Sequence, residues 1–168
     1  MPQIPLLAWI FQTIPECIAT ASLAMSIATN EFYWNKIWKI GLAQAIITYL
    51  IRLLPFTPGV HVIILAATLG VLCIHIGKIE MKRALTFSAI TMAVLVLAEF
   101  VSVYSLMSLG LTNFEEMSQN IYLRIIYGCP HIIIVFLIAL LFVKKKLNLT
   151  FLFRKSDNYY FTEREIDE

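Results

Sequence analysis

The chain has 168 residues, of which 60% are hydrophobic and 14% are charged, and its formal net charge is +2. Soluble domains carry about 25% charged residues, so this composition excludes an ordinary soluble domain and indicates an integral membrane protein. The small positive charge gives no support for nucleic-acid binding, and the lipid bilayer is the first partner that the composition implies.

Five apolar segments are suited to crossing a hydrocarbon core about 30 Å thick, which takes roughly 20 helical residues. The expected fold class is all-α, a polytopic membrane helix bundle of five transmembrane helices. The bundle is expected at 1–143 and a juxtamembrane tail at 144–168. The first segment has no basic start and contains Glu16, which favours a retained helix over a cleaved signal peptide. The five segments lie at 4–29, 37–54, 60–76, 84–109 and 121–143.

The basic residues predict how the chain is oriented, because Lys and Arg collect on the cytoplasmic side of a membrane. With five spans, all but two of the 13 Lys and Arg residues fall on one side, and the exceptions are Arg52 and Arg124. We therefore expect the N-terminus outside and the C-terminus inside. The expected location is the cell membrane, as a multi-pass protein of the bacterial cytoplasmic membrane.

The first span carries Gln12, Glu16 and Thr20 at i, i+4 spacing, which places them on one helix face. A charge inside a bilayer is costly and usually has a partner or a function. Pro15 removes one backbone hydrogen bond, so we expect a kink beside Glu16.

Small residues dominate the cytoplasmic half of this span and include Ala24 and Ala28. Small residues let helix backbones approach closely, so this half is expected to pack on another helix of the same chain or of a partner. A homo-oligomer and a membrane partner on the Ala24/Ala28 face both remain open.

The second span carries Gly41, Gln44, Thr48 and Arg52 on one stripe. Arg52 lies within about one turn of the outer end, where two readings are possible. Its guanidinium either extends to the lipid headgroups or points into the bundle.

In the third span His61, Thr68 and His75 are spaced by seven residues, nearly two helical turns, and so share one face. This face either holds satisfied structural residues or lines a cavity. His75 is expected to be the main interior polar group of the cytoplasmic half.

The last two spans each contribute an ionisable residue near the membrane centre. Glu99 lies in the fourth span, and the fifth carries Arg124 and, seven residues later, His131 behind Pro130. The tail begins basic and apolar, a pattern typical of a segment that lies on anionic lipid, and it is expected to contact a cytoplasmic partner.

At about 1.5 Å per helical residue, Glu16 lies roughly 18 Å from the outer end of its span, and Glu99 and His131 roughly 15 Å from theirs. Arg52, His61 and Arg124 lie closer to the outside. We therefore expect a polar pocket that opens outward, although these side chains could instead only hydrogen-bond across helices. The candidate ligand-binding residues are Glu16, Arg52, His61, Glu99, Arg124 and His131.

No enzyme signature is present: the chain lacks HExxH, GxSxG and a glycine-rich phosphate loop. Cys17, Cys73 and Cys129 lie inside spans without CxxC spacing, so we expect buried thiols and no structural disulfide. We expect no catalytic residue, no metal and no cofactor.

The polar positions also form a pattern with one part in each span. It consists of Ile14-Pro15-Glu16, Ile51-Arg52 before Leu54-Pro55-Phe56, Gly59-Val60-His61, Glu99, and Arg124 followed by Pro130-His131. This pattern covers nearly the whole chain and resembles the N-terminal multi-span sensor module of bacterial quorum-type sensor histidine kinases. Nothing after Lys144 resembles the phosphoacceptor helix or ATP-binding domain of those kinases. The resemblance implies an outward-facing input module for a small molecule or peptide, with a separate signalling partner.

Three functions are therefore considered. The first is a non-enzymatic sensor or regulator that binds an extracellular ligand. The second is a small-solute transporter, or the substrate-binding subunit of one. The third is an intramembrane enzyme using Glu16, Glu99 and His131 as acid and base, which rests only on their shared depth.

Overall fold

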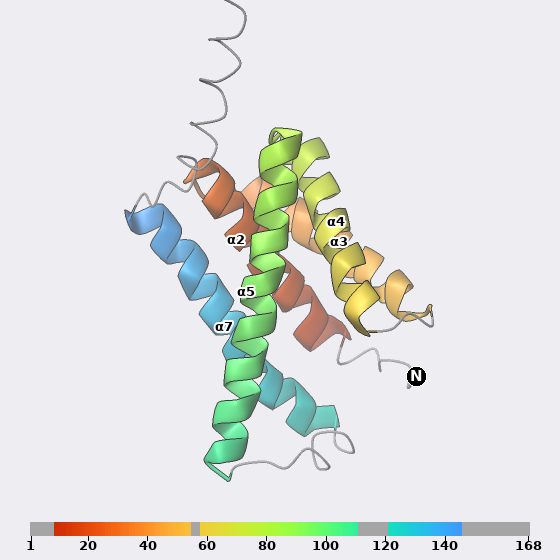
Figure 1. Cartoon of the computed structure of the whole chain (residues 1–168), viewed down its shortest axis with the longest axis vertical. Coiled ribbons are helices and arrows are strands. Elements are labelled where there is room, and N and C mark those ends of the chain that lie inside the picture. Colours follow the sequence, from red (N-terminus) through yellow and green to blue (C-terminus); the bar gives the residue numbers. More distant parts are fainter. Residues whose placement is uncertain (1–8, 55–57, 111–120, 146–168) are drawn as a thin grey trace, which may run out of the picture.

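The structure is a computed structural model that describes residues 9–54, 58–110 and 121–145 (Figure 1). Within this part of the chain, side chains are described for all residues except Pro58, Ile121, Tyr122 and Arg124. The expected tail lies almost entirely outside the described residues. The described chain is helical, with a π-helical turn followed by five helices: η1 Trp9–Thr13, α2 Ile14–Thr29, α3 Trp34–Arg52, α4 Pro58–His75, α5 Met81–Ser108 and α7 Ile121–Lys145.

Three segments are long and apolar enough to cross a membrane: Trp9–Thr29, Met81–Ser108 and Ile125–Lys145. They confirm the expectation of a helical membrane protein. The apolar stretch of α4, Gly59–His75, is slightly shorter. α3 starts with a polar turn that contains Asn35, Lys36 and Lys39 and lowers its hydropathy.

Helix α2 forms the centre of the bundle. It contacts α3, α4, α5 and α7, and in Figure 1 it passes behind α5 with α7 on one side and α3 and α4 on the other. Its small-residue half is buried: Ala24 is 1% exposed and Ala28 is 9% exposed. The Ala24/Ala28 face therefore packs against the chain's own helices, which is the first of the two arrangements that the sequence left open.

Helices α2 and α3 approach each other closely at Gly41. A Cβ atom at this position would lie 2.8 Å from Ile18 Cγ1 and 2.9 Å from Ile18 Cα. Only a glycine allows this approach without moving a backbone. The contact holds α3, and with it the polar stripe that ends at Arg52, against the central helix.

The chain enters α2 through a change of helix type. The π-helical turn η1 ends at Thr13, and Pro15 follows in the first turn of α2. Proline has no N–H to donate to the carbonyl four residues earlier, here that of Phe11, so the α-helical pattern cannot continue unbroken through this point. Where a kink was expected at Pro15, the structure has a π-helical turn that ends at Thr13.

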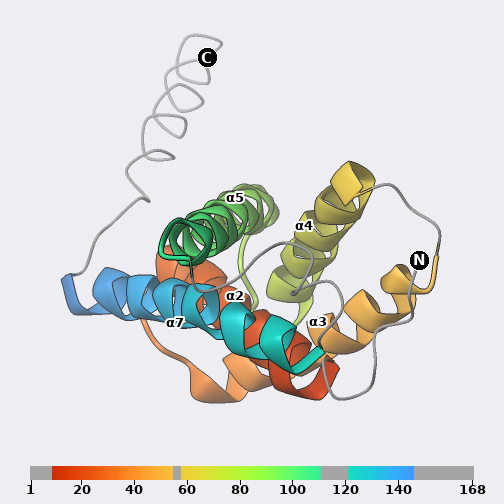
Figure 2. The same cartoon turned by 90° about the horizontal axis from the view of Figure 1, so that it is seen from below.

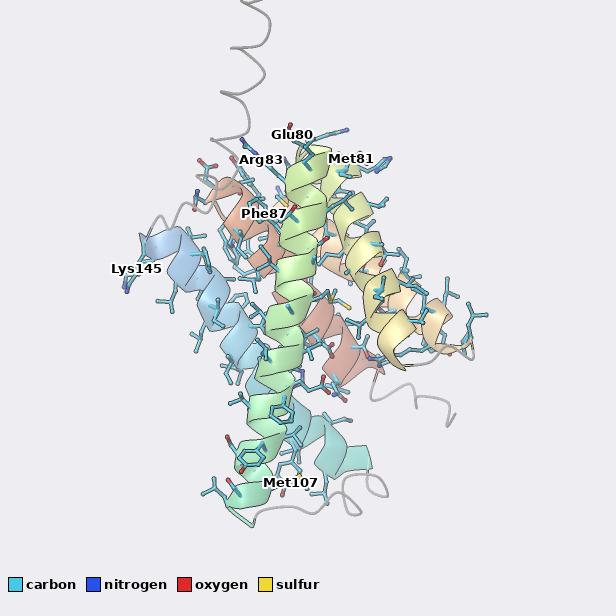
Figure 3. All side chains as sticks on the ribbon, viewed as in Figure 1. Glu80, Met81, Arg83, Phe87, Met107 and Lys145 are labelled. Carbon is cyan, nitrogen blue, oxygen red and sulfur yellow. The ribbon has the colours of Figure 1, made fainter. Side chains whose placement is uncertain are left out.

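Basic side chains mark one end of the bundle, which we call the basic end. There Lys36 Nζ donates a hydrogen bond to Gly77 O at 3.0 Å, tying the start of α3 to the turn after α4. Figure 3 shows Arg83 at this end of α5, and Lys145 in the same half of the molecule. Arg52 lies at the far end of α3 from Lys36. This distribution agrees with the charge asymmetry from which the orientation was predicted.

The α4–α5 turn at the basic end closes around a left-handed residue. Lys78 has a φ of 60°, and Ile79 N donates to Cys73 O at 3.3 Å. This bond reaches six residues back along the chain and satisfies one of the carbonyl groups that the end of a helix leaves without an intrahelical partner. The turn thus fixes how α4 and α5 pack side by side.

Candidate functional site

The structure describes five of the six candidate side chains, and each comes from a different helix. Glu16, Arg52 and His61 are half-buried, Glu99 is exposed and His131 is only 3% exposed. They lie on α2, α3, α4, α5 and α7 respectively. The sixth candidate, Arg124, is in α7, and its side chain is outside the described set.

Electrostatic interactions connect these five side chains. Glu16 is attracted by Arg52 and repelled by Glu99. Glu99 also interacts with His131. Arg52 interacts in turn with His61. We call this group of Glu16, Arg52, His61, Glu99 and His131 the polar cluster, and it brings one ionisable residue from every long helix to a single region.

Arg52 points into the bundle. Its Nη1 donates a long hydrogen bond, 3.5 Å, to Thr13 Oγ1. Thr13 is the last residue of the π-helical turn and is buried. The guanidinium therefore reaches from the end of α3 to the start of α2, close to Glu16, as expected from the inward reading of its position.

Thr13 is a residue that the sequence analysis missed. Threonine is common in membrane helices, so its identity carried no signal. Its spacing did carry one, because Thr13 lies three residues before Glu16 and so on nearly the same helix face.

His131 forms the buried part of the polar cluster. Its Nδ1 is buried and has no hydrogen-bond partner among the described residues. Most buried polar atoms in proteins are hydrogen-bonded, so an unpartnered ring nitrogen is unusual and indicates strain, a binding function or bound water. Glu99, which interacts with His131, is exposed. The cluster thus joins a buried imidazole to a carboxylate that the described helices leave uncovered.

No close ion pair neutralises the carboxylates among the described side chains. The salt bridge found there joins Arg83 Nε to Glu80 Oε2 at 3.5 Å, at the basic end. Figure 3 shows both residues at one end of α5. The attraction of Glu16 by Arg52 therefore acts over a longer distance than a direct salt bridge.

The cysteines do not contribute to the polar cluster. Cys17 Sγ lies 3.8 Å from Thr48 Oγ1 on α3. Cys17, Cys73 and Cys129 are all free. Among the described residues no group of three His, Cys, Asp or Glu side chains could hold a metal ion.

The expectation for His75 was wrong. The side chain is exposed at the end of α4, and its Nδ1 lies 3.0 Å from Val71 O of the same helix. The buried face of α4 instead contains Leu69 and Cys73. Residues spaced by seven fall 20° short of two full helical turns. This angular offset adds up from His61 through Thr68 to His75 and turns His75 away from the face that holds His61.

A second polar contact joins α3 and α4 in the interior. Gln44 is 1% exposed, and its Nε2 donates to Leu65 O and to Thr68 Oγ1, both at 3.1 Å. These bonds use the polar stripe of α3 and the polar face of α4 to hold the two helices together. Thr68 therefore has a structural role.

The bundle also has an apolar groove of about 440 Å³ between α2, α3 and α7. It contains no charged or hydroxyl side chain and is distinct from the polar cluster. Nothing in it favours a particular polar ligand. Its lining residues are Ile14, Pro15, Ile18, Ala19, Trp38, Ile132, Ile133, Phe136 and Leu137.

Comparison with known proteins gives no relative: no family model matches the chain, and neither the curated proteins nor the solved structures contain a significant match. A functional proposal therefore depends on the arrangement of the residues themselves.

Proposed function

We propose that this protein is a non-enzymatic sensory or regulatory membrane protein that binds an extracellular small molecule or peptide at the polar cluster. The proposal includes five spans, an N-terminus outside and a cytoplasmic C-terminus. It also places the protein in the bacterial cytoplasmic membrane. The observation that supports it is the convergence of one ionisable residue from each of the five long helices.

Energetics favour a functional reason for this convergence. An acidic residue at the centre of a membrane helix costs about 2.5 to 3.5 kcal/mol. Hydrogen bonds between membrane helices contribute only about 0.6 kcal/mol on average. Two carboxylates, Glu16 and Glu99, are therefore a poor means of stabilising the bundle. A ligand that makes favourable contacts with them gives a reason to retain both.

The position of α2 suggests how binding would reach the cytoplasm. Glu16 lies near the start of this central helix, which contacts all the other long helices and ends at Thr29 near the basic end. A ligand that prefers one arrangement of the helices shifts the population toward it. The tail after Lys145 would then carry the change to a cytoplasmic partner.

Binding to the purified full chain in lipid nanodiscs tests this function. The protein is incubated with the medium of the cells that carry it, and retained compounds are identified by mass spectrometry. We expect a compound that wild type retains and that Glu16→Gln and Glu99→Gln lose. Glu31→Gln is the matched control, because it makes the same chemical change at an exposed residue between α2 and α3. A set of retained compounds that is identical for all four proteins contradicts the proposal.

A small-solute transporter, or a substrate-binding subunit of one, is the second candidate. It is favoured by buried hydroxyl groups without hydrogen-bond partners among the described residues, those of Ser26, Thr91 and Ser102. Polar groups of this kind along a bundle interior suit a hydrated path. Solute uptake by vesicles containing the purified chain would support this function, and absence of flux across a broad solute panel would count against it.

A further inference from the structure

We propose that the apolar groove between α2, α3 and α7 holds one acyl chain of an anionic phospholipid, whose headgroup lies at the basic end. The groove is separate from the polar cluster. The inference therefore adds a lipid site to the molecule and does not depend on the proposed function.

The groove has the chemistry and the size of a site for a hydrocarbon chain. Its lining contains no charged or hydroxyl side chain, and its volume is about 440 Å³. An apolar cavity of about 150 Å³ stays dry and binds benzene, so this groove has room for a longer hydrocarbon. Both α2 and α7 belong to segments suited to crossing a membrane, where acyl chains surround the helices.

The lining differs from a surface on which a further helix would pack. Membrane helices associate through small residues and through polar side chains that hydrogen-bond across the interface. Ala19 is the smallest residue of the lining, and it is already buried. The other walls are formed by Pro15 and by large aliphatic and aromatic side chains. A flexible acyl chain follows such a wall more closely than a rigid helix about 10 Å across.

Aromatic rings border the groove on the side of the basic end. The ring of Phe136, which lines the groove, lies 6.0 Å from the ring of Phe32 and 6.2 Å from that of Trp34, measured between centroids. Trp38, also in the lining, lies one turn further along α3. Tryptophan gathers at the level of lipid headgroups. The groove therefore begins just below the headgroups of the leaflet at the basic end.

Lysines at this end provide the charge that an anionic headgroup requires. Lys39 directly follows Trp38 and is exposed. Lys144 is also exposed and lies seven residues after Leu137, so it is on nearly the same face of α7 as this lining residue. Neither lysine forms a salt bridge with a described side chain. Figure 3 shows the neighbouring Lys145 at the end of α7.

The depth of the groove matches one chain of that leaflet. At about 1.5 Å per residue, Leu137 lies roughly 10 Å from Lys144 along α7, and Ile132 lies roughly 18 Å from it. Half of a hydrocarbon core is about 15 Å thick. A lipid whose headgroup contacts Lys144 would therefore place the terminal part of one chain in the groove.

The test uses the fluorescence of Trp38, because brominated acyl chains quench a tryptophan that they contact. The full chain with Trp9→Phe and Trp34→Phe is placed in phosphatidylcholine vesicles that contain a small fraction of brominated lipid. This lipid is either phosphatidylglycerol, which is anionic, or phosphatidylcholine. We expect Trp38 to be quenched by the anionic lipid as strongly as by a roughly fivefold higher fraction of the zwitterionic one, the effect of one lysine near the surface.

A second reporter measures the preference outside the groove. It is Val71→Trp, with Trp38→Phe added. Val71 and Trp38 are both 48% exposed, and each lies one turn from the basic end of its helix. The reporter at position 71 should prefer the anionic lipid less than Trp38 does, because no lining residue of the groove lies on α4.

Variants assign the two parts of the lipid. Leu137→Phe narrows the groove and should reduce quenching of Trp38, whereas Leu141→Phe, a change at a similarly exposed residue outside the lining, should not. Lys39→Gln and Lys144→Gln should each lower the preference for the anionic lipid by roughly fivefold. Lys78→Gln, in the turn between α4 and α5, is their control. The unfolding midpoint shows whether each variant is folded.

Three results would contradict the inference. Equal quenching of Trp38 by the two brominated lipids would remove the anionic headgroup. An equal preference at positions 38 and 71 would indicate general attraction of anionic lipid to the basic end, without a site. Weaker quenching at position 38 than at position 71 by both lipids would mean that a helix of a second copy or of another protein covers the groove. The proposed function is tested separately by retention of compounds from the medium.

Discussion

At the scale of single residues, the polar cluster depends on side chains whose cost in a membrane is not offset by close pairing with another described side chain. Glu16 and Glu99 have no salt bridge among the described side chains, and His131 Nδ1 has no hydrogen bond there. Other residues are fixed by packing alone, and Gly41 is the clearest. The two kinds respond differently to substitution, since loss of a cluster side chain should change binding and a change at Gly41 should change stability.

Gly41→Ala should destabilise the bundle by about 1 to 3 kcal/mol, the usual cost of overpacking. The added Cβ would lie 2.9 Å from the Cα of Ile18, and a backbone atom cannot move aside cheaply. Gly59→Ala is the control, because its Cβ would have no neighbour within 4 Å. Unfolding titrations in mixed micelles measure both, and equal stability of the two variants would contradict the close approach of α2 and α3.

Lys78→Gly should stabilise the protein by about 1 kcal/mol, because a non-glycine residue in the left-handed region is strained. Lys78 has a φ of 60° and lies in the turn between α4 and α5. The same titration checks this, with Lys82→Gly as a control that should destabilise because position 82 lies in the first turn of α5. A destabilised Lys78→Gly variant would contradict the turn described here.

At the scale of elements, the hydrophobic pattern predicted five helical segments well. Their lengths and ends are set by runs of apolar residues and by breaks such as 55–59, which the sequence displays directly. The hydrophobic pattern could not decide which helix covers a small-residue face. A small residue such as Ala24 packs equally well against a helix of the same chain and against a helix of a partner. The pattern also could not predict the outward turn of His75, which depends on small rotations summed along α4.

The candidate site could be predicted in part for the same reason. Depth counted along each helix suggested that Glu16, Glu99 and His131 lie near one another, and Glu99 interacts electrostatically with each of the other two. The exposure of Glu99 could not be foreseen. The 28 residues of α5 span about 42 Å, more than a hydrocarbon core of about 30 Å, so depth counted from its end is not depth in a bilayer.

Pro15→Ala should convert the π-helical turn before α2 toward an α-helix, because alanine supplies the missing N–H. That change would alter the register of Trp9, whose Nε1 now donates to Ala45 O at 3.1 Å. Fluorescence of Trp9, in a background with Trp34→Phe and Trp38→Phe, reports its environment. An emission spectrum that Pro15→Ala leaves unchanged would argue against the proline as the cause of the turn.

At the scale of the whole molecule, the arrangement places a polar cluster toward one end of a helical bundle and basic residues at the other. α2 connects the two through its contacts with every other long helix, and Figure 2 shows it enclosed by α3, α5 and α7. Under the proposed function, α2 would transmit a binding event at the polar cluster to the basic end. In the proposed orientation, the polar cluster lies toward the outside of the cell and the basic end lies in the cytoplasm.

Accessibility of position 99 in intact cells tests the central claim most directly. Cys17→Ser, Cys73→Ala and Cys129→Ala remove the native thiols, and Glu99→Cys then places a single one in the cluster. Lys78→Cys in the same background serves as the control for the basic end. A membrane-impermeant thiol reagent added outside should label position 99 in intact cells, and position 78 only after the membrane is opened. Labelling of position 99 only after opening, or not at all, would contradict an outward-facing site.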